Sequence, residues 1–171
     1  MFSTIVVPVD GSEPSEHALQ FASELARQHD ARLILVHVLL RGTSVPAMRE
    51  LAESKGFLEE VKSDIADVEI MPVATAAGVA APVEVVPDET LQRFGQFLLK
   101  TAADSAHDVE DIQQRVLDGD PADAILQCAE AENASLIVIG SRGVGDLKSL
   151  LLGSVSHKLV QHSKCPCLVV K

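Results

Sequence analysis

A run of glycines and serines near the carboxyl end of the chain has the composition of an anion-binding loop. The apolar segment Leu136 to Ile139 predicts a buried strand, which ends at Gly140 and is followed by Gly143. Gly153 and Ser154 then open a segment with a helical pattern. Glycine lets a ligand approach the backbone closely, and the free N–H groups at a helix N-terminus attract negative charge. The stretch therefore predicts a phosphate site, with a glycine loop at one end and a helix N-terminus at the other.

A second candidate residue, Asp10, follows the first predicted strand. That strand is the β-branched run Thr4 to Val9, in which Pro8 suits only the strand end because proline has no N–H group to donate. Asp10 then opens a turn, and Ser12 is placed to cap the helix that follows. Two interpretations of the Asp10 carboxylate stay open. It holds a ribose hydroxyl or a phosphate-bound metal ion, or it only shapes the turn.

The elements that must position these residues alternate regularly between strand and helix. Strands are predicted at residues 4–9, 32–38, 112–117, 136–139 and 165–170, with amphipathic helices between them. Strands joined by helices run parallel, and the crossovers are right-handed. We therefore expect an α/β fold, an open five-stranded parallel doubly wound sheet with helices on both faces. Polar residues within 112–117 predict an edge strand, and ligands of such sheets bind at the carboxyl ends of the strands.

Residues 41–87 interrupt this alternation. The segment 45–65 has a helical pattern that Gly56 is placed to break, and the Pro-, Gly- and Ala-rich segment 71–87 predicts a mobile linker or lid. A partner-binding patch is the alternative interpretation of that linker. We expect residues 1–171 to form a single domain with a helical and flexible insertion around 41–87.

Composition restricts the partners. The chain of 171 residues has a formal net charge of −11 and neither Trp nor Tyr, which argues against nucleic acid and anionic membranes as partners. Three cysteines form no disulfide framework and suit a reducing compartment. No secretory signal pattern is present, and prolines and a glutamate interrupt the mostly apolar segment Ile70 to Pro87. We therefore expect a cytoplasmic protein.

Histidine, cysteine and serine side chains could also form a metal or catalytic site. His162, Cys165 and Cys167 have the side chains of a zinc site, but no fourth ligand is evident, so core or interface thiols are favoured. Ser154 has His157 three residues later without an acid to orient it, which disfavours a nucleophile. His37 is expected to be a strand residue that packs under a helix.

The glycines follow a longer pattern than the common phosphate-binding motifs. There is no Gly-Lys-Ser/Thr, and the glycines do not follow the first strand as in the dinucleotide fingerprint. The spacing is Gly140-x2-Gly143-x9-Gly153-Ser154. Together with the start Ile5 to Ser12 and the end Cys165 to Val170, this spacing resembles the ATP-binding branch of the universal stress protein family. The resemblance implies a Rossmann-like fold similar to that of adenine nucleotide alpha hydrolases.

The resemblance also implies roles for individual residues in binding ATP, with Mg²⁺ where it accompanies the phosphates. Val9 and Val38 would flank the adenine, and Val116 would touch it. Asp10 would hold the ribose or a phosphate-bound Mg²⁺, while the protein alone supplies no metal site. The other expected nucleotide-binding residues are Pro8, Gly140, Gly143, Gly153, Ser154, Val155 and Ser156. Arg142 is a further candidate from its position alone, either as a phosphate ligand or as a solvated loop residue. Since the family is usually dimeric, a homodimer through Leu168 to Val170 is implied, beside a protein partner that the sequence does not identify.

Two functions follow from such a site. One is a nucleotide-dependent regulatory protein of the stress response, and the other is a weak ATPase or an enzyme that transfers a phosphoryl or adenylyl group. Phosphoryl transfer needs a metal, a positioned nucleophile and concentrated positive charge. The predicted site is mainly backbone and has no evident base, so we favour ATP binding without catalytic residues, with slow hydrolysis as the alternative.

Overall fold

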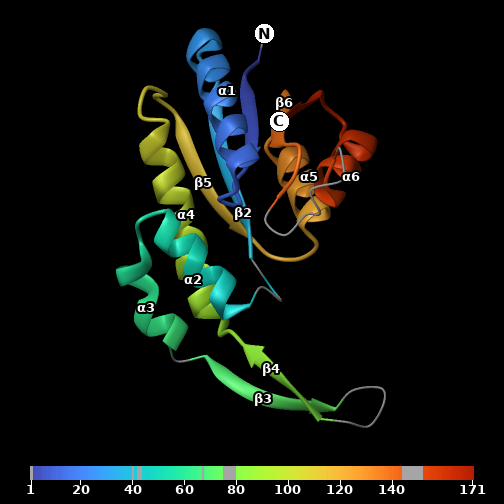
Figure 1. Cartoon of the computed structure of the whole chain (residues 1–171). Helices are drawn as coiled ribbons and strands as arrows, with labels where there is room; N and C mark the ends of the chain where they lie inside the picture. The colour runs from blue at the N-terminus through green and yellow to red at the C-terminus, as the bar shows by residue number, and fades with distance from the viewer. Residues whose placement is uncertain (1, 40, 42–43, 67, 75–79, 144–151) are drawn as a thin grey trace. The chain divides into compact units, whose positions relative to one another are not determined.

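The structure is a computed structural model that describes residues 2–39, 41, 44–66, 68–74, 80–143 and 152–171 (Figure 1). The chain divides into two compact units, which are described separately. The first comprises Met1–Leu39 with Leu98–Lys171, and the second comprises Leu40–Phe97.

A five-stranded sheet forms the first unit, and all of its strand pairs are parallel. Its order is β5-β2-β1-β6-β7, with β1 at the centre. The strands are β1 (Thr4–Pro8), β2 (Arg32–Val38), β5 (Ile112–Leu117), β6 (Leu136–Gly140) and β7 (Cys167–Val170). The helices of this unit are α1 (Glu13–His29), α5 (Pro121–Ala131), α6 (Ser154–His162) and the end of α4 (Asp88–Ser105). The predicted α/β fold is confirmed, and β5 lies at an edge as its polar residues indicated.

Apolar side chains form a separate cluster on each face of this sheet. Ile5 and Val7 of β1 point into a cluster with α1 and the end of α4, whereas Val6 points into a cluster with α5 and α6. Successive residues of a strand face opposite sides, so a continuous β-branched run suits a strand that is covered on both faces. Figure 1 shows α1 on one side of the sheet and the pair α5 and α6 on the other.

Local signals in the sequence determine where these elements begin. The Ser12 hydroxyl caps α1 by accepting a hydrogen bond from the Ser15 N–H at 3.4 Å, and Asp120 caps α5 in the same way at 3.1 Å from the Asp123 N–H. Pro8 is the last residue of β1, the position that sequence analysis assigned to it.

The second unit contains two short helices and a β-hairpin. The helices α2 (Val45–Ser54) and α3 (Leu58–Ala66) are separated at Gly56, which has a φ of +77°, so the predicted helix break is confirmed. The segment 71–87, for which the sequence predicted a mobile linker or lid, instead contributes to β3 (Glu69–Ala74) and β4 (Ala80–Val85), which pair antiparallel. Pro72 and Pro82 are register partners, and proline is tolerated there because both strands of a two-stranded ribbon are edges.

Aromatic and charged contacts hold the helices of this unit together. The Phe57 ring lies 5.1 Å from that of Phe94 and 5.6 Å from that of Phe97, measured between ring centroids. Arg93 of α4 donates to the Asp64 carboxylate of α3 at 2.9 Å. Within the part of the chain that the structure describes, no helix has both the length and the apolar character of a membrane span.

Candidate functional site

The strand order places the candidate site at the carboxyl ends of β1 and β6. The chain continues from β1 to β2 on one side, while β6 pairs with β1 on the other side. Ligands of open α/β sheets bind where the strand order reverses in this way. The residues that follow the two strands, 9–12 and 141–143, therefore meet at the position that the fold reserves for a ligand.

Asp10 and Gly143 are in close contact across this point. One oxygen of the Asp10 carboxylate accepts hydrogen bonds from the Ser12 N–H at 2.9 Å and from the Ser12 hydroxyl at 2.6 Å. The other oxygen lies where a side chain at Gly143 would have to go, because a Cβ built there falls 2.5 Å from it. The Ser12 hydroxyl also lies 3.5 Å from the Arg142 carbonyl. The structure therefore brings together three of the predicted site residues, Asp10, Arg142 and Gly143, from opposite ends of the chain.

Gly140 has a packing role of its own. A Cβ at this position would fall 2.7–2.8 Å from backbone atoms of Pro14 and Ser15 in the first turn of α1. The Ser15 hydroxyl donates to the Pro8 carbonyl at 3.2 Å and accepts from the Asp10 N–H at 3.3 Å. Gly140 thus lets the first turn of α1 lie directly on the end of β6, and Ser15 joins that turn to the loop after β1.

The N-terminus of α6 is attached to the loop after β6 through the backbone of Ser141. The Gly153 N–H donates to the Ser141 carbonyl at 2.7 Å, and the buried Ser156 hydroxyl lies 2.9 Å from the same carbonyl oxygen. Gly153 is the N-cap of α6, and its lack of a side chain leaves the first-turn N–H groups without a side-chain cap. The Ser154 side chain is exposed, and Val155 packs against the cluster under α5 and α6. These N–H groups are the kind of donors that bind phosphate.

The side chains of the three valines that were expected to contact adenine do not all lie on one face of the sheet. Val9 is buried in the cluster under α1, and Val116 packs against that cluster, but Val38 packs against the cluster on the opposite face. Their backbones do lie together, at the carboxyl ends of the adjacent strands β1, β2 and β5. The Val9 N–H donates to the Val36 carbonyl at 2.8 Å. The N–H of Leu39, which follows Val38, donates to the Leu117 carbonyl at 2.9 Å.

His37 is a structural neighbour of the site whose contact with it sequence analysis did not predict. It is 1% exposed, which confirms the expected buried strand residue, and its Nδ1 donates to the Val9 carbonyl at 2.7 Å. Burial lowers the pKa of His37, and the Val9 carbonyl and the Asp10 charge oppose that shift only partly. Nε2 is buried and has no partner among the residues that the structure describes. The signal in the sequence that could have indicated this contact is the position of His37 near the end of the strand that pairs with β1.

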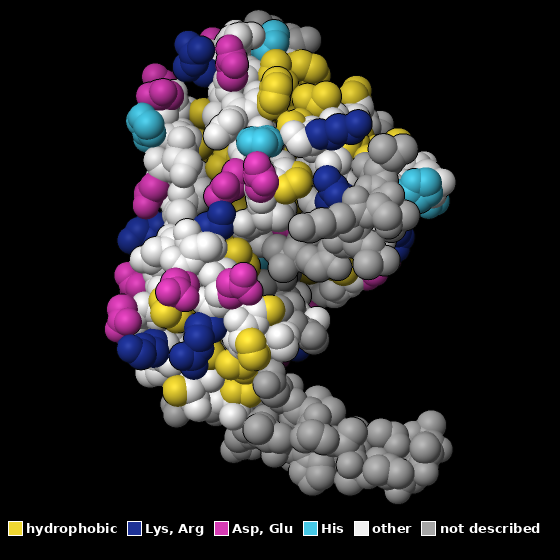
Figure 2. Space-filling view, viewed as in Figure 1, with side chains coloured by type: hydrophobic (Ala, Val, Ile, Leu, Met, Phe, Trp, Pro, Cys, Tyr) yellow, Lys and Arg dark blue, Asp and Glu magenta, His cyan; other side chains and the backbone are white. Residues whose placement is uncertain are grey.

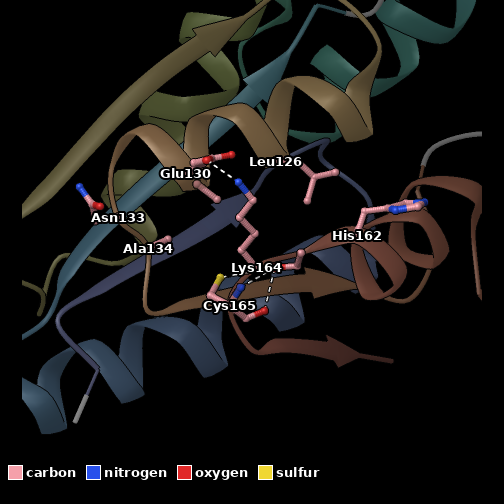
Figure 3. A pocket seen from close by; sticks show the side chains of 9 residues that line it. Leu126, Glu130, Asn133, Ala134, His162, Lys164 and Cys165 are labelled. Carbon is pink, nitrogen blue, oxygen red and sulfur yellow. Dashed lines mark hydrogen bonds and ion pairs between the residues drawn. The ribbon is translucent and has the colours of Figure 1, made fainter.

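The predicted thiol residues lie at the other end of the sheet. Cys165 lines a pocket of about 390 Å³ between α5 and the turn from α6 to β7, where Lys164 donates to Glu130 at 2.5 Å (Figure 3). Burial raises the pKa of the Cys167 thiol to about 11, so this thiol is protonated at neutral pH. Among the described residues, no three His, Cys, Asp or Glu side chains are placed to hold a metal ion. The pocket lies at the end of the sheet opposite the candidate site.

Comparison with known proteins agrees with this fold. The model of the universal stress protein family matches residues 1–171. A universal stress protein of Thermus aquaticus is 33% identical over 171 residues, which cover 100% of both chains. The solved structure of MJ0577 of Methanocaldococcus jannaschii is 26% identical with a TM-score of 0.64, covering 100% of this chain and 96% of that one. A universal stress protein family protein of Arabidopsis thaliana, solved with AMP bound, has the same fold at 19% identity and a TM-score of 0.59, covering 99% and 91%. This chain therefore belongs to the universal stress protein family.

Proposed function

We propose that the chain binds ATP at the carboxyl ends of β1 and β6 and acts as a nucleotide-dependent regulatory protein. The observation that carries this proposal is the contact of Asp10 with Gly143, where a side chain on the glycine would occupy the position of a carboxylate oxygen. A glycine so close to an acidic group, beside an uncapped helix N-terminus, suits a ribose and its phosphates. The AMP bound to the Arabidopsis relative supports an adenine nucleotide as the ligand.

Backbone groups supply most of this proposed site. The chain carries a formal net charge of −11, and on the face seen in Figure 2 the described Lys and Arg side chains are interspersed with Asp and Glu. A phosphate would therefore be held by helix N–H groups and by local side chains such as Arg142, and not by a broad positive field. Asp10 has the oxygen ligands that Mg²⁺ prefers and would contact a Mg²⁺ ion carried by the phosphates.

Binding without efficient turnover is the function that this arrangement supports. One Asp10 oxygen already accepts two hydrogen bonds from Ser12, so its lone pairs serve the turn and not an attacking water. Asp10 is also the only titratable carboxylate among the proposed site residues. A weak ATPase, or transfer of a phosphoryl or adenylyl group, is the alternative outcome of the test below.

The test is calorimetric titration of the purified chain with ATP, ADP and AMP. The wild type should bind, and Gly143→Ala should weaken binding at least about tenfold, because the new Cβ pushes the Asp10 carboxylate out of place. Ala131→Val, which adds side-chain volume at an exposed position of α5, is the control and should bind as the wild type does. A wild type that binds none of the three nucleotides would refute the proposal. Release of phosphate over many turnovers would favour the enzyme instead.

We also propose that two copies pair through β7. This strand is an edge of the sheet, so one side of its backbone is not paired within the sheet. Leu168 on β7 is 38% exposed, and Phe21 on α1, a helix that packs against β7, is 56% exposed. Apolar side chains beside a free strand edge favour strand pairing with a second copy.

A further inference from the structure

Ser156 lies in the first turn of α6, and its side chain faces the protein interior. The residue is 2% exposed, and its Oγ lies 2.9 Å from the Ser141 carbonyl oxygen and 3.0 Å from the Gly153 carbonyl oxygen. A hydroxyl carries one proton, and both neighbours are acceptors, so the hydroxyl donates inward. The Ser154 side chain, by contrast, is exposed.

The partner of Ser156 is a residue at which three segments meet. Ser141 is 1% exposed and follows β6 directly. Its N–H donates to the carbonyl of Val170 at the end of β7 at 2.5 Å, and its carbonyl accepts from the Gly153 N–H at 2.7 Å as well as from Ser156. Gly153 and Ser156 therefore join the α6 N-terminus to the loop after β6 through hydrogen bonds to one carbonyl group.

We infer that Ser156 is a positioning residue of the nucleotide site: its hydroxyl holds the N-terminus of α6 against the loop that carries Gly143. This inference rests on the proposed function and assigns a different task to each serine. The backbone N–H groups of the first turn, with the exposed Ser154 hydroxyl, contact the phosphates, while the Ser156 hydroxyl sets the direction in which those N–H groups point.

The inference predicts a selective loss of affinity. Removing the Ser156 hydroxyl leaves the Ser141 carbonyl with the Gly153 N–H alone, so the helix start can shift relative to the loop. An N–H group binds phosphate well only when it points at a phosphate oxygen, so a shifted helix start weakens phosphate binding. The loop after β1, which would hold adenosine, does not depend on the Ser156 hydrogen bond. ATP binding should therefore weaken while adenosine binding stays the same.

The experiment compares the affinities of the whole chain for ATP and for adenosine by calorimetry. Ser156→Ala should weaken ATP binding about tenfold and change adenosine binding less than about twofold. Ser156→Thr keeps a hydroxyl and should restore most of the ATP affinity. Ser23→Ala is the matched control, since Ser23 is also a helical serine that donates to a backbone carbonyl, that of Leu19, at 2.8 Å. It should leave both affinities unchanged.

The ratio of the two affinities separates positioning from general stability, because partial unfolding reduces the number of active molecules and not this ratio. An unchanged ratio in Ser156→Ala, or an equal loss for ATP and adenosine, would overturn the inference. So would failure of Ser156→Thr to restore ATP binding when its thermal midpoint equals that of the wild type. A wild type that does not bind ATP would instead refute the proposed function itself.

Discussion

At the scale of single residues, both backbone polar groups of Val9 are hydrogen-bonded to β2. Its N–H donates to the Val36 carbonyl at 2.8 Å, and its carbonyl accepts from His37 Nδ1 at 2.7 Å. Because a carbonyl can only accept, the imidazole carries its proton on Nδ1. His37 therefore fixes the direction of the chain immediately before Asp10, provided that it is buried and neutral.

This contact predicts a pH dependence of stability. The pKa of folded His37 is below its ordinary value of 6.5, so the unfolded chain takes up a proton first as the pH falls. The stabilisation is complete above pH 6.5 and is lost as the pH falls from there toward the lowered pKa of the folded state. The loss from this residue approaches about 1.4 kcal/mol for each pH unit within that window.

Urea unfolding of the wild type and of His37→Asn between about pH 8 and pH 5.5 measures this effect. Asparagine retains a donor for the Val9 carbonyl but does not titrate, so the difference in unfolding free energy between the two proteins should shrink as the pH falls. The other five histidines are common to both proteins and cancel in this difference. Parallel pH curves would show that His37 does not carry the dependence.

At the scale of elements, the contact of β6 with the first turn of α1 decides where the two loops of the site meet. Gly140 allows that contact, because a Cβ there would fall within 2.8 Å of the α1 backbone. Ser15 then joins the same turn to Pro8 and Asp10. The glycine that sequence analysis placed at the ligand thus has a structural reason to be glycine, whether or not it also touches a nucleotide.

Gly140→Ala should destabilise the protein by about 1–3 kcal/mol, because backbone atoms cannot rotate away from the added carbon as a side chain can. Ile139→Val, in the same strand, removes one carbon and should cost about 0.5–1.5 kcal/mol. Chemical denaturation of both variants gives the two costs. A Gly140→Ala variant as stable as the wild type would mean that α1 and β6 do not pack this closely.

At the scale of the whole molecule, the described sheet ends on a free strand. The proposed pairing of two copies through β7 would cover Leu168 and place the two sheets in one continuous sheet. The strands of the second unit, β3 and β4, form a separate two-stranded sheet and come between β2 and β5 in the sequence. That this unit is an insertion into a single domain stays a prediction.

Leu168→Asp should convert the dimer to a monomer, because a carboxylate on β7 would face its own symmetry copy without water or an opposite charge. Size-exclusion chromatography with light scattering measures the mass, expected near twice 18.2 kDa for the wild type and near 18.2 kDa for the variant. Val160→Asp is the control, because Val160 is also an exposed apolar residue, 50% exposed against 38% for Leu168, but lies on α6 and not on the strand edge. A monomeric wild type would refute the proposed pairing.

The sequence by itself determined the strands and helices of the five-stranded sheet unit. Hydrophobic runs predicted the five strands of the parallel sheet, Ser12 predicted the start of a helix, and the polar residues of 112–117 predicted the edge strand. These features depend on neighbouring residues and on the spacing of apolar residues, both of which are visible in a short stretch of sequence. The hairpin of β3 and β4 was not predicted because prolines in a sequence are evidence against strands. Proline disfavours only a strand that is paired on both sides, and each strand of this hairpin is paired on one side.

The tertiary structure alone decided what the site residues touch. Spacing groups Ser154 with Ser156, yet one is exposed and the other is hydrogen-bonded to Ser141. It also groups Val9 with Val38, although they pack on opposite faces of the sheet. The contact of Asp10 with Gly143 joins loops that are far apart in the chain and become neighbours because β1 and β6 are paired. Such contacts depend on strand order and on the face to which each side chain points, and neither is a local property of the sequence.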